Sequence, residues 1–223
     1  DWSSDVCSSD LFLIFTVDRF SPTHYNTLSI IPLEENPTVT KKRSYLPTSP
    51  ACFVCGEKNH AGLQGRFYVE DDAVFMPLNI KDHHCGYPNV VHGGIVAAAL
   101  DECMAWAATR AVGRMCVTGK LTVRYVDRTP AIAGLIVRAV VTRSNKRIAY
   151  AESELKGETG KVYARAEGAF MPVSAKETIA VDDGLIYQGN EERLFDSLRD
   201  ATEDDEQRNP SKKGTDDPKV LEN

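Results

Sequence analysis

The chain has 223 residues and a formal charge of −6, a length sufficient for one domain with a sizeable core and additional tails. Residues 191–223 hold eleven acidic and six basic residues, so the rest of the chain is close to neutral and lacks the basic field of a nucleic-acid-binding protein. The chain contains no run of about 18 apolar residues, which is the length that would predict a membrane span. The six cysteines lack the spacing of a secreted disulfide framework, which favours a reducing, cytoplasmic location.

The first 50 residues give little indication of a fold. Residues 1–11 (DWSSDVCSSDL) read like the in-frame translation of a sequencing-library adapter, and we exclude them from fold reasoning. We treat residues 12–50 as an uncertain N-terminal segment or linker, because prolines interrupt them. These prolines are Pro22, Pro32, Pro37, Pro47 and Pro50.

Cys52 and Cys55 form a single Cys-x-x-Cys pair followed by Gly56. A structural zinc site needs four ligands, and a second such pair is absent. A tight turn is therefore our preferred interpretation, and we expect no metal. A redox pair is less favoured still, because no helix-start pattern follows directly. A zinc site would have to be completed by His60, His83, His84 or Cys85.

The next elements are predicted to be a hairpin, a polar loop and a long helix. Residues 66–70 and 73–78 have the pattern of paired strands, and residues 79–89 form the loop. Residues 95–111 are almost all small or apolar, which is typical of a helix enclosed by other structure. Gly113 is the expected C-terminal stop of that helix.

After the helix the pattern changes to strands with hairpin turns between them. The predicted strands are 115–126, 135–142, 147–155 and 161–171. One long apolar helix followed by an antiparallel meander predicts an α+β fold in which a curled sheet wraps a central helix. Residues 174–223 are predicted to be an acidic, disordered tail with a possible short helix over 191–200.

Two adjacent acids, Asp101 and Glu102, interrupt the apolar helix. A carboxylate is costly in an apolar environment unless something compensates it, and adjacent helical positions point about 100° apart. Asp101 is the better inward candidate, because its neighbours three and four positions away are small or apolar. We assign Glu102 to the surface or an interface, and it is the fallback if the register is off by one.

The start of the helix offers a second chemical group. Gly93 and Gly94 leave backbone N–H groups uncovered where the helix dipole favours a polarised oxygen. Gly93 and Asp101 lie roughly 12 Å apart along one helix, too far for one carbonyl group to contact both. We therefore predict that two chains pack antiparallel and share an active site in a homo-oligomer, a dimer or a dimer of dimers.

The string Gly86 to Gly94 (GYPNVVHGG), with Asp101 nine residues after His92, resembles the PaaI-like branch of the hotdog-fold acyl-CoA thioesterases. Cys52 to Gly56 with Asn59, Gly62 and Leu63 resembles the entry segment of many bacterial members. The resemblance covers about residues 51–173, which it implies are a hotdog thioesterase domain. It also implies hydrolysis of an acyl-CoA thioester to a free acid and coenzyme A, without a cofactor or metal.

Roles for individual residues follow from the same resemblance. Asp101 acts as a general base or as a nucleophile, and the sequence does not choose between them. Gly93 polarises the thioester carbonyl, Thr118 holds the water or the carboxylate, and His92 contributes to the chemistry or anchors the loop. For each of these residues a purely structural role is the alternative. The residues expected to bind the substrate are Gly94, Tyr125, Arg128, Asn145, Lys146 and Arg147.

One departure from the family pattern bears on activity. Related sequences commonly have Asn or Gln six or seven residues before the histidine, where this chain has Gly86 and Cys85. His83 or His84 would have to substitute, unless the backbone alone polarises the carbonyl or the activity is weak. A non-catalytic acyl-CoA-binding sensor or scaffold is thus the alternative function. A serine hydrolase is disfavoured because no G-x-S-x-G motif occurs.

Overall fold

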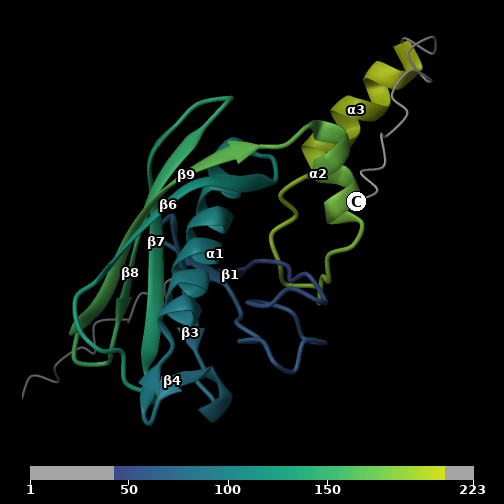
Figure 1. The fold of residues 1–223 in the computed structure, drawn as a ribbon. Helices are drawn as coiled ribbons and strands as arrows, with labels where there is room; N and C mark the ends of the chain where they lie inside the picture. Colours follow the sequence, from purple (N-terminus) through teal and green to yellow (C-terminus); the bar gives the residue numbers. More distant parts are fainter. Residues whose placement is uncertain (1–42, 209–223) are drawn as a thin grey trace, which may run out of the picture. The chain divides into compact units, whose positions relative to one another are not determined.

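The computed structural model describes residues 43–208, all within one unit of the chain, Thr40–Asn223. Expectations about residues 1–11, most of 12–50 and the end of the tail lie outside the described residues. The described part is a large antiparallel sheet with one long helix packed on one face (Figure 1). None of its helices is long and apolar enough to cross a membrane.

The long helix α1 spans Gly93–Val112, close to the predicted 95–111. It begins at His92, whose ring caps the first turn, and ends at Gly113, which adopts a left-handed φ of 72° that favours glycine. Its inner positions are completely or almost completely buried against the sheet, which explains why apolar residues occupy so much of its circumference.

The sheet has seven strands in the order β1-β2-β3-β7-β8-β9-β6, with every neighbouring pair antiparallel. The strands are β1 (Ser44–Tyr45), β2 (Tyr68–Glu70), β3 (Ala73–Leu78), β6 (Cys116–Tyr125), β7 (Leu135–Ser144), β8 (Ala149–Lys156) and β9 (Val162–Pro172). A short 3-10 helix η1 (Asp82–His84) and a two-stranded sheet of β4 (Cys85–Tyr87) and β5 (Val90–Val91) precede α1. The α+β layout and the hairpins predicted from the sequence are confirmed.

Strands β7 and β8 show why the helix packs on one face. Leu135, Val137 and Ala139 of β7 are buried and alternate with half-buried residues, and β8 repeats the alternation. Successive strand residues point to opposite faces, so each strand presents one apolar row to α1. Strand β6 differs, because it ends the sheet and most of its side chains are exposed.

The C-terminal region is more ordered than predicted. Residues 174–208 contain α2 (Ala175–Asp182) and α3 (Asp196–Arg208), where we expected a disordered tail with one short helix. The segment between them is tied to the domain by a salt bridge of 2.8 Å from Arg66 to Glu191 and one of 2.7 Å from Arg110 to Glu192. Phe195 is also 1% exposed. The charge-rich composition of this segment did not indicate these few contacts, because they form only with residues of the folded domain.

Candidate active site

Asp101 lies in the middle of α1 and faces strand β6. The Thr118 hydroxyl lies 3.0 Å from Oδ1 and 3.2 Å from Oδ2 of Asp101 and donates to this carboxylate. Burial raises the pKa of Asp101, and the hydrogen bond from Thr118 opposes the shift. The predicted pairing of these two residues is therefore present. It lies at β6, the last strand of the sheet, whose outer side has no partner strand within the described residues.

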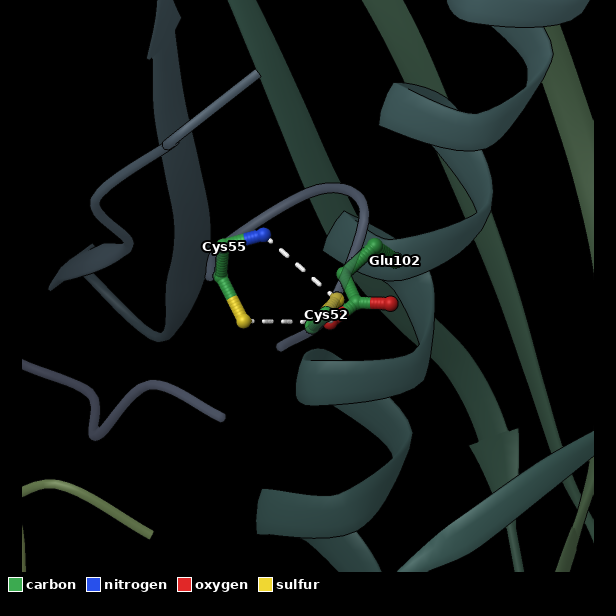
Figure 2. A group of neighbouring side chains, drawn as sticks. All are labelled: Cys52, Cys55 and Glu102. Atoms are coloured by element: carbon green, nitrogen blue, oxygen red, sulfur yellow. Dashed lines mark hydrogen bonds between the residues drawn. The ribbon is translucent and has the colours of Figure 1, made fainter. Parts of the chain in front are cut away.

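Glu102 contacts the Cys-x-x-Cys segment, as Figure 2 shows, whereas Asp101 contacts Thr118 of β6. Its Oε1 accepts from the Cys52 thiol at 3.4 Å and from the Cys55 thiol at 3.6 Å. Burial raises the pKa of Glu102 to about 8, and Cys52 contributes to the shift. Glu102, which was expected at the surface or an interface, is half-buried, because the loop carrying the two cysteines folds over this position of α1.

The two thiols differ in electrostatic environment although they share one carboxylate. Hydrogen bonding from the Cys55 thiol lowers the pKa of Cys52, helped by the N–H groups of Cys55 and Val54. The same interaction and burial raise the pKa of Cys55. Both sulfurs and a carboxylate oxygen of Glu102 lie within 4.8 Å of one another. Within residues 43–208, these three residues form a group of His, Cys, Asp or Glu side chains that could hold a metal ion.

The start of α1 holds most of the other predicted residues. His92 Nδ1 accepts from the Gly94 N–H at 3.0 Å, so His92 acts as a cap and Gly94 has its donor occupied. The Ile95 and Val96 N–H groups donate to the His92 carbonyl. Among the hydrogen bonds of the described residues, none has the Gly93 N–H as donor. That group is thus available to polarise a ligand oxygen.

Tyr125 ties the helix start to the end of β6. Its hydroxyl donates to the Gly93 carbonyl at 2.7 Å. Gly93 and Tyr125 line a cavity of about 410 Å³ together with Arg128 and His92. Asp101 does not line this cavity, in agreement with the helical distance between the two predicted catalytic groups. Within a single chain, the Asp101 carboxylate and the free Gly93 N–H therefore lie at separate places.

The cations expected to bind the substrate lie in the turn between β7 and β8. Asn145 is a turn residue whose Oδ1 accepts from the Arg147 N–H at 2.8 Å and from the Ile148 N–H at 3.1 Å. Lys146 and Arg147 are exposed and do not line the cavity at the helix start. The turn is nevertheless at the Asp101 end of the sheet. Thr118 pairs with Phe170 of β9, and Phe170 pairs with Ala149, the first residue of β8.

The histidines considered as replacements for the missing amide do not share one environment. His84 is buried, and its Nδ1 accepts from the Lys81 N–H at 3.1 Å while Nε2 lies 3.3 Å from the Ala61 carbonyl. Both ring nitrogens are occupied, so His84 supports the loop and cannot hold a substrate carbonyl. His83 is exposed and packs edge-on against the His84 ring.

A second cavity was not predicted from the sequence. It has about 550 Å³, and its lining is mostly apolar. Trp106 and Cys116 contribute from the α1 and β6 side, Val181 contributes from α2, and Glu102 and Cys55 lie at its wall. The part played by α2 was missed because its residues were assigned to the tail.

Comparison with known proteins gives a family match over part of the chain. The model of the thioesterase superfamily matches residues 88–164, and no curated protein matches the chain.

A solved phenylacetic acid degradation-related protein from Ralstonia eutropha JMP134 is 27% identical, with 49% of this chain and 85% of that chain covered and a TM-score of 0.44. The PaaI protein of E. coli is 18% identical, with 50% and 81% covered and a TM-score of 0.45. A Bacillus halodurans protein solved with CoA is 26% identical, with 50% and 76% covered and a TM-score of 0.46. The matched segment contains His92, Asp101 and Thr118, and over this part of the chain the sequence is similar to the thioesterase superfamily. The long helix and the large antiparallel sheet agree with the hotdog fold.

Proposed function

We propose that this chain hydrolyses an acyl-CoA thioester to a free carboxylic acid and coenzyme A, as a PaaI-like thioesterase. The similarity of residues 88–164 to the thioesterase superfamily supports hydrolysis of a thioester as the general reaction. The observation that carries the more specific proposal is the pairing of Asp101 with Thr118 at an open sheet edge. The same edge strand carries Tyr125, which contacts the carbonyl of Gly93.

The active site is completed by a second copy of the chain. Asp101 is near the beginning of β6, at Thr118, and Gly93 is near its end, at Tyr125. If two β6 edges pair antiparallel about a two-fold axis, the beginning of one strand lies opposite the end of the other. The Asp101 carboxylate of one copy then faces the Gly93 N–H of its partner. The exposed edge of β6 is available for that pairing.

The chemistry follows from these two groups. The Gly93 N–H and the dipole of α1 stabilise negative charge on the thioester oxygen, as in an oxyanion hole. Asp101 takes a proton from water as the water oxygen bonds to the acyl carbon. The C–S bond then breaks, and the proton passes to the departing thiolate. In the nucleophilic variant the carboxylate attacks first, and water hydrolyses the resulting anhydride.

Positively charged side chains are placed to position coenzyme A. Its phosphates need cations near the mouth of the site. Arg128 lies at the cavity beside Gly93. Lys146 and Arg147 lie in the turn before Ala149, which is two strands, roughly 10 Å, from Thr118 across the sheet. Substrate binding by these residues is part of the proposal.

The alternative function is binding of acyl-CoA without turnover. The observation in its favour is that no amide occupies the loop before His92: Gly86 and Cys85 stand there, and the ring nitrogens of His84 are occupied. The free Gly93 N–H favours catalysis, because it supplies a donor without that amide.

The deciding experiment is a thiol-release assay over a panel of acyl-CoA substrates. Asp101→Asn should lower kcat/KM by about 10²–10⁴-fold, the usual contribution of a positioned acid or base. Asp72→Asn is the matched control, because it makes the same chemical change in an exposed turn between β2 and β3. Hydrolysis that survives in Asp101→Asn would refute the mechanism. Calorimetric binding of acyl-CoA by a wild-type protein without turnover would establish the sensor instead.

A further inference from the structure

We propose that Cys52, Cys55 and Glu102 form a zinc site that anchors the Cys-x-x-Cys loop to α1. Figure 2 shows the three side chains converging, with the loop in contact with the helix and one oxygen of Glu102 directed away from the sulfurs. This site is separate from the proposed hydrolysis of thioesters. Asp101 faces β6, whereas Glu102 faces the loop.

The distances fit a tetrahedral centre. With Zn–S near 2.3 Å and Zn–O near 2.0 Å, a sulfur and an oxygen bound to one zinc ion lie about 3.5 Å apart. The two sulfur-to-oxygen distances are 3.4 Å from Cys52 and 3.6 Å from Cys55. All three ligand atoms lie within 4.8 Å of one another. A zinc ion can therefore bind with little movement of the ligand side chains.

The backbone is arranged to support thiolate ligands. The N–H groups of Val54 and Cys55 donate to the Cys52 sulfur at 3.2 and 3.5 Å, and the Ser49 N–H donates to the Cys55 sulfur at 3.4 Å. The turn is closed by a hydrogen bond of 3.0 Å from the Gly56 N–H to the Cys52 carbonyl. A Cβ at Gly56 would lie 2.4 Å from that carbonyl oxygen, so only glycine fits. Such donors stabilise anionic sulfur and orient it toward a cation.

Glu102 has no cationic partner in the described part of the chain. None of the salt bridges in residues 43–208 includes Glu102, and its hydrogen-bond partners are the two thiols. Zinc binds the two cysteines as thiolates and Glu102 as a carboxylate, and the protons that these groups carry beforehand pass to the buffer. Three protein ligands leave the fourth position open. Cys55 and Glu102 border the cavity of about 550 Å³, from which water can supply that ligand.

The first test is metal binding by the reduced full-length chain. We expect one Zn²⁺ per chain by elemental analysis, and Co²⁺ should give the sulfur charge-transfer and tetrahedral d–d absorption of a thiolate site. Cys52→Ser, Cys55→Ser and Glu102→Gln should each lose most of the stoichiometry. Cys85→Ser is the control, because that half-buried thiol contacts only a carbonyl at 4.0 Å in the described structure. A cobalt spectrum without thiolate absorption, or an unchanged Glu102→Gln, would contradict the three-ligand site.

The second test uses the wild-type chain and does not depend on the folding of any variant. Alkylation mapped by mass spectrometry should show that Zn²⁺ protects Cys52 and Cys55 and leaves the labelling of Cys85 unchanged. Equal labelling with and without Zn²⁺ overturns the proposal. So does a Cys52–Cys55 disulfide in a protein that binds no Zn²⁺ after reduction, because the pair would then be a redox couple.

Discussion

The hydroxyl of Thr118 donates to both oxygens of Asp101, at 3.0 and 3.2 Å, and it does so across the gap between the central helix and the edge strand of the sheet. The interaction holds the carboxylate beside β6, which pairs with β9 on one side and has no partner strand on its outer side in the described part of the chain. It thereby connects the catalytic proposal with the assembly that the proposal needs.

Replacement of Thr118 tests whether this hydrogen bond positions the carboxylate. A hydrogen bond to a charged group is worth about 1.5–3 kcal/mol, so Thr118→Val should lower kcat by about tenfold or more. Thr118→Ser keeps the hydroxyl and should retain most of the activity. The free energy of unfolding should change little, because Thr118 is exposed. Equal activity of the two variants would show that the hydroxyl has no part in catalysis.

Gly93→Pro removes the proposed oxyanion donor without removing the helix. Proline is well tolerated at the first helical position, and His92 has φ −60° and ψ 134°, a conformation suited to a residue before proline. We expect kcat to fall by about 10²-fold with nearly unchanged helicity by circular dichroism. Gly93→Ala is the control, since it keeps the N–H and its Cβ would only contact Tyr125, at 3.4 Å from the hydroxyl oxygen. A fully active Gly93→Pro would exclude the role of this N–H.

Mixing the two inactive variants tests the shared site directly. A heterodimer of Asp101→Asn and Gly93→Pro contains one site with both defects and one site with neither. After dissociation and random reassociation, half of the dimers are heterodimers, so the mixture should regain about a quarter of the wild-type activity. Thiol release before and after reassociation measures this. If activity does not return although sedimentation shows mixed dimers, each chain must hold its own complete site.

His84 should make stability depend on pH. Burial lowers the pKa of His84, and the nearby His83 and Lys81 act in the same direction. A histidine with a depressed pKa in the folded state contributes stability that is present above its unfolded pKa of about 6.5 and is lost as the pH falls through the folded pKa. Protonation of Nδ1 also removes the hydrogen bond from the Lys81 N–H, worth about 1 kcal/mol. Urea unfolding from pH 7.5 to 5 should show a steeper loss for wild type than for His84→Gln. His60→Gln, at an exposed histidine, should behave like wild type.

The ordered C-terminal helices predict a cost for breaking their contact. Arg199 donates to Asp182 at 2.6 Å, and the Asp182 side chain is 2% exposed. Arg199→Ala leaves that carboxylate without its cation and should lower the free energy of unfolding by about 2 kcal/mol. Lys161→Ala breaks an exposed pair with Asp127 and should lower the free energy of unfolding much less, because solvent screens such a pair. Equal effects in chemical denaturation would mean that α3 is not docked in solution.

The sequence by itself determined the central helix, the strands after it and the inward placement of Asp101. Each of these follows from local periodicity, because 3.6-residue and two-residue repeats report which face of an element is buried. The contact of Asp101 with Thr118 was implied only by the resemblance to the PaaI-like thioesterases. The end of α1 was also predictable, because Gly113 adopts a conformation that glycine favours.

Only the tertiary structure decided the environment of Glu102, the occupied ring of His84 and the order of residues 174–208. Cys52 and Glu102 are 50 positions apart, and the burial of one depends on where the loop of the other folds. The segment between the C-terminal helices is held by separate salt bridges to Arg66 and Arg110, and such contacts produce no periodic pattern in a charged sequence. Contacts between residues distant in sequence depend on the packing of whole elements, which local patterns do not encode.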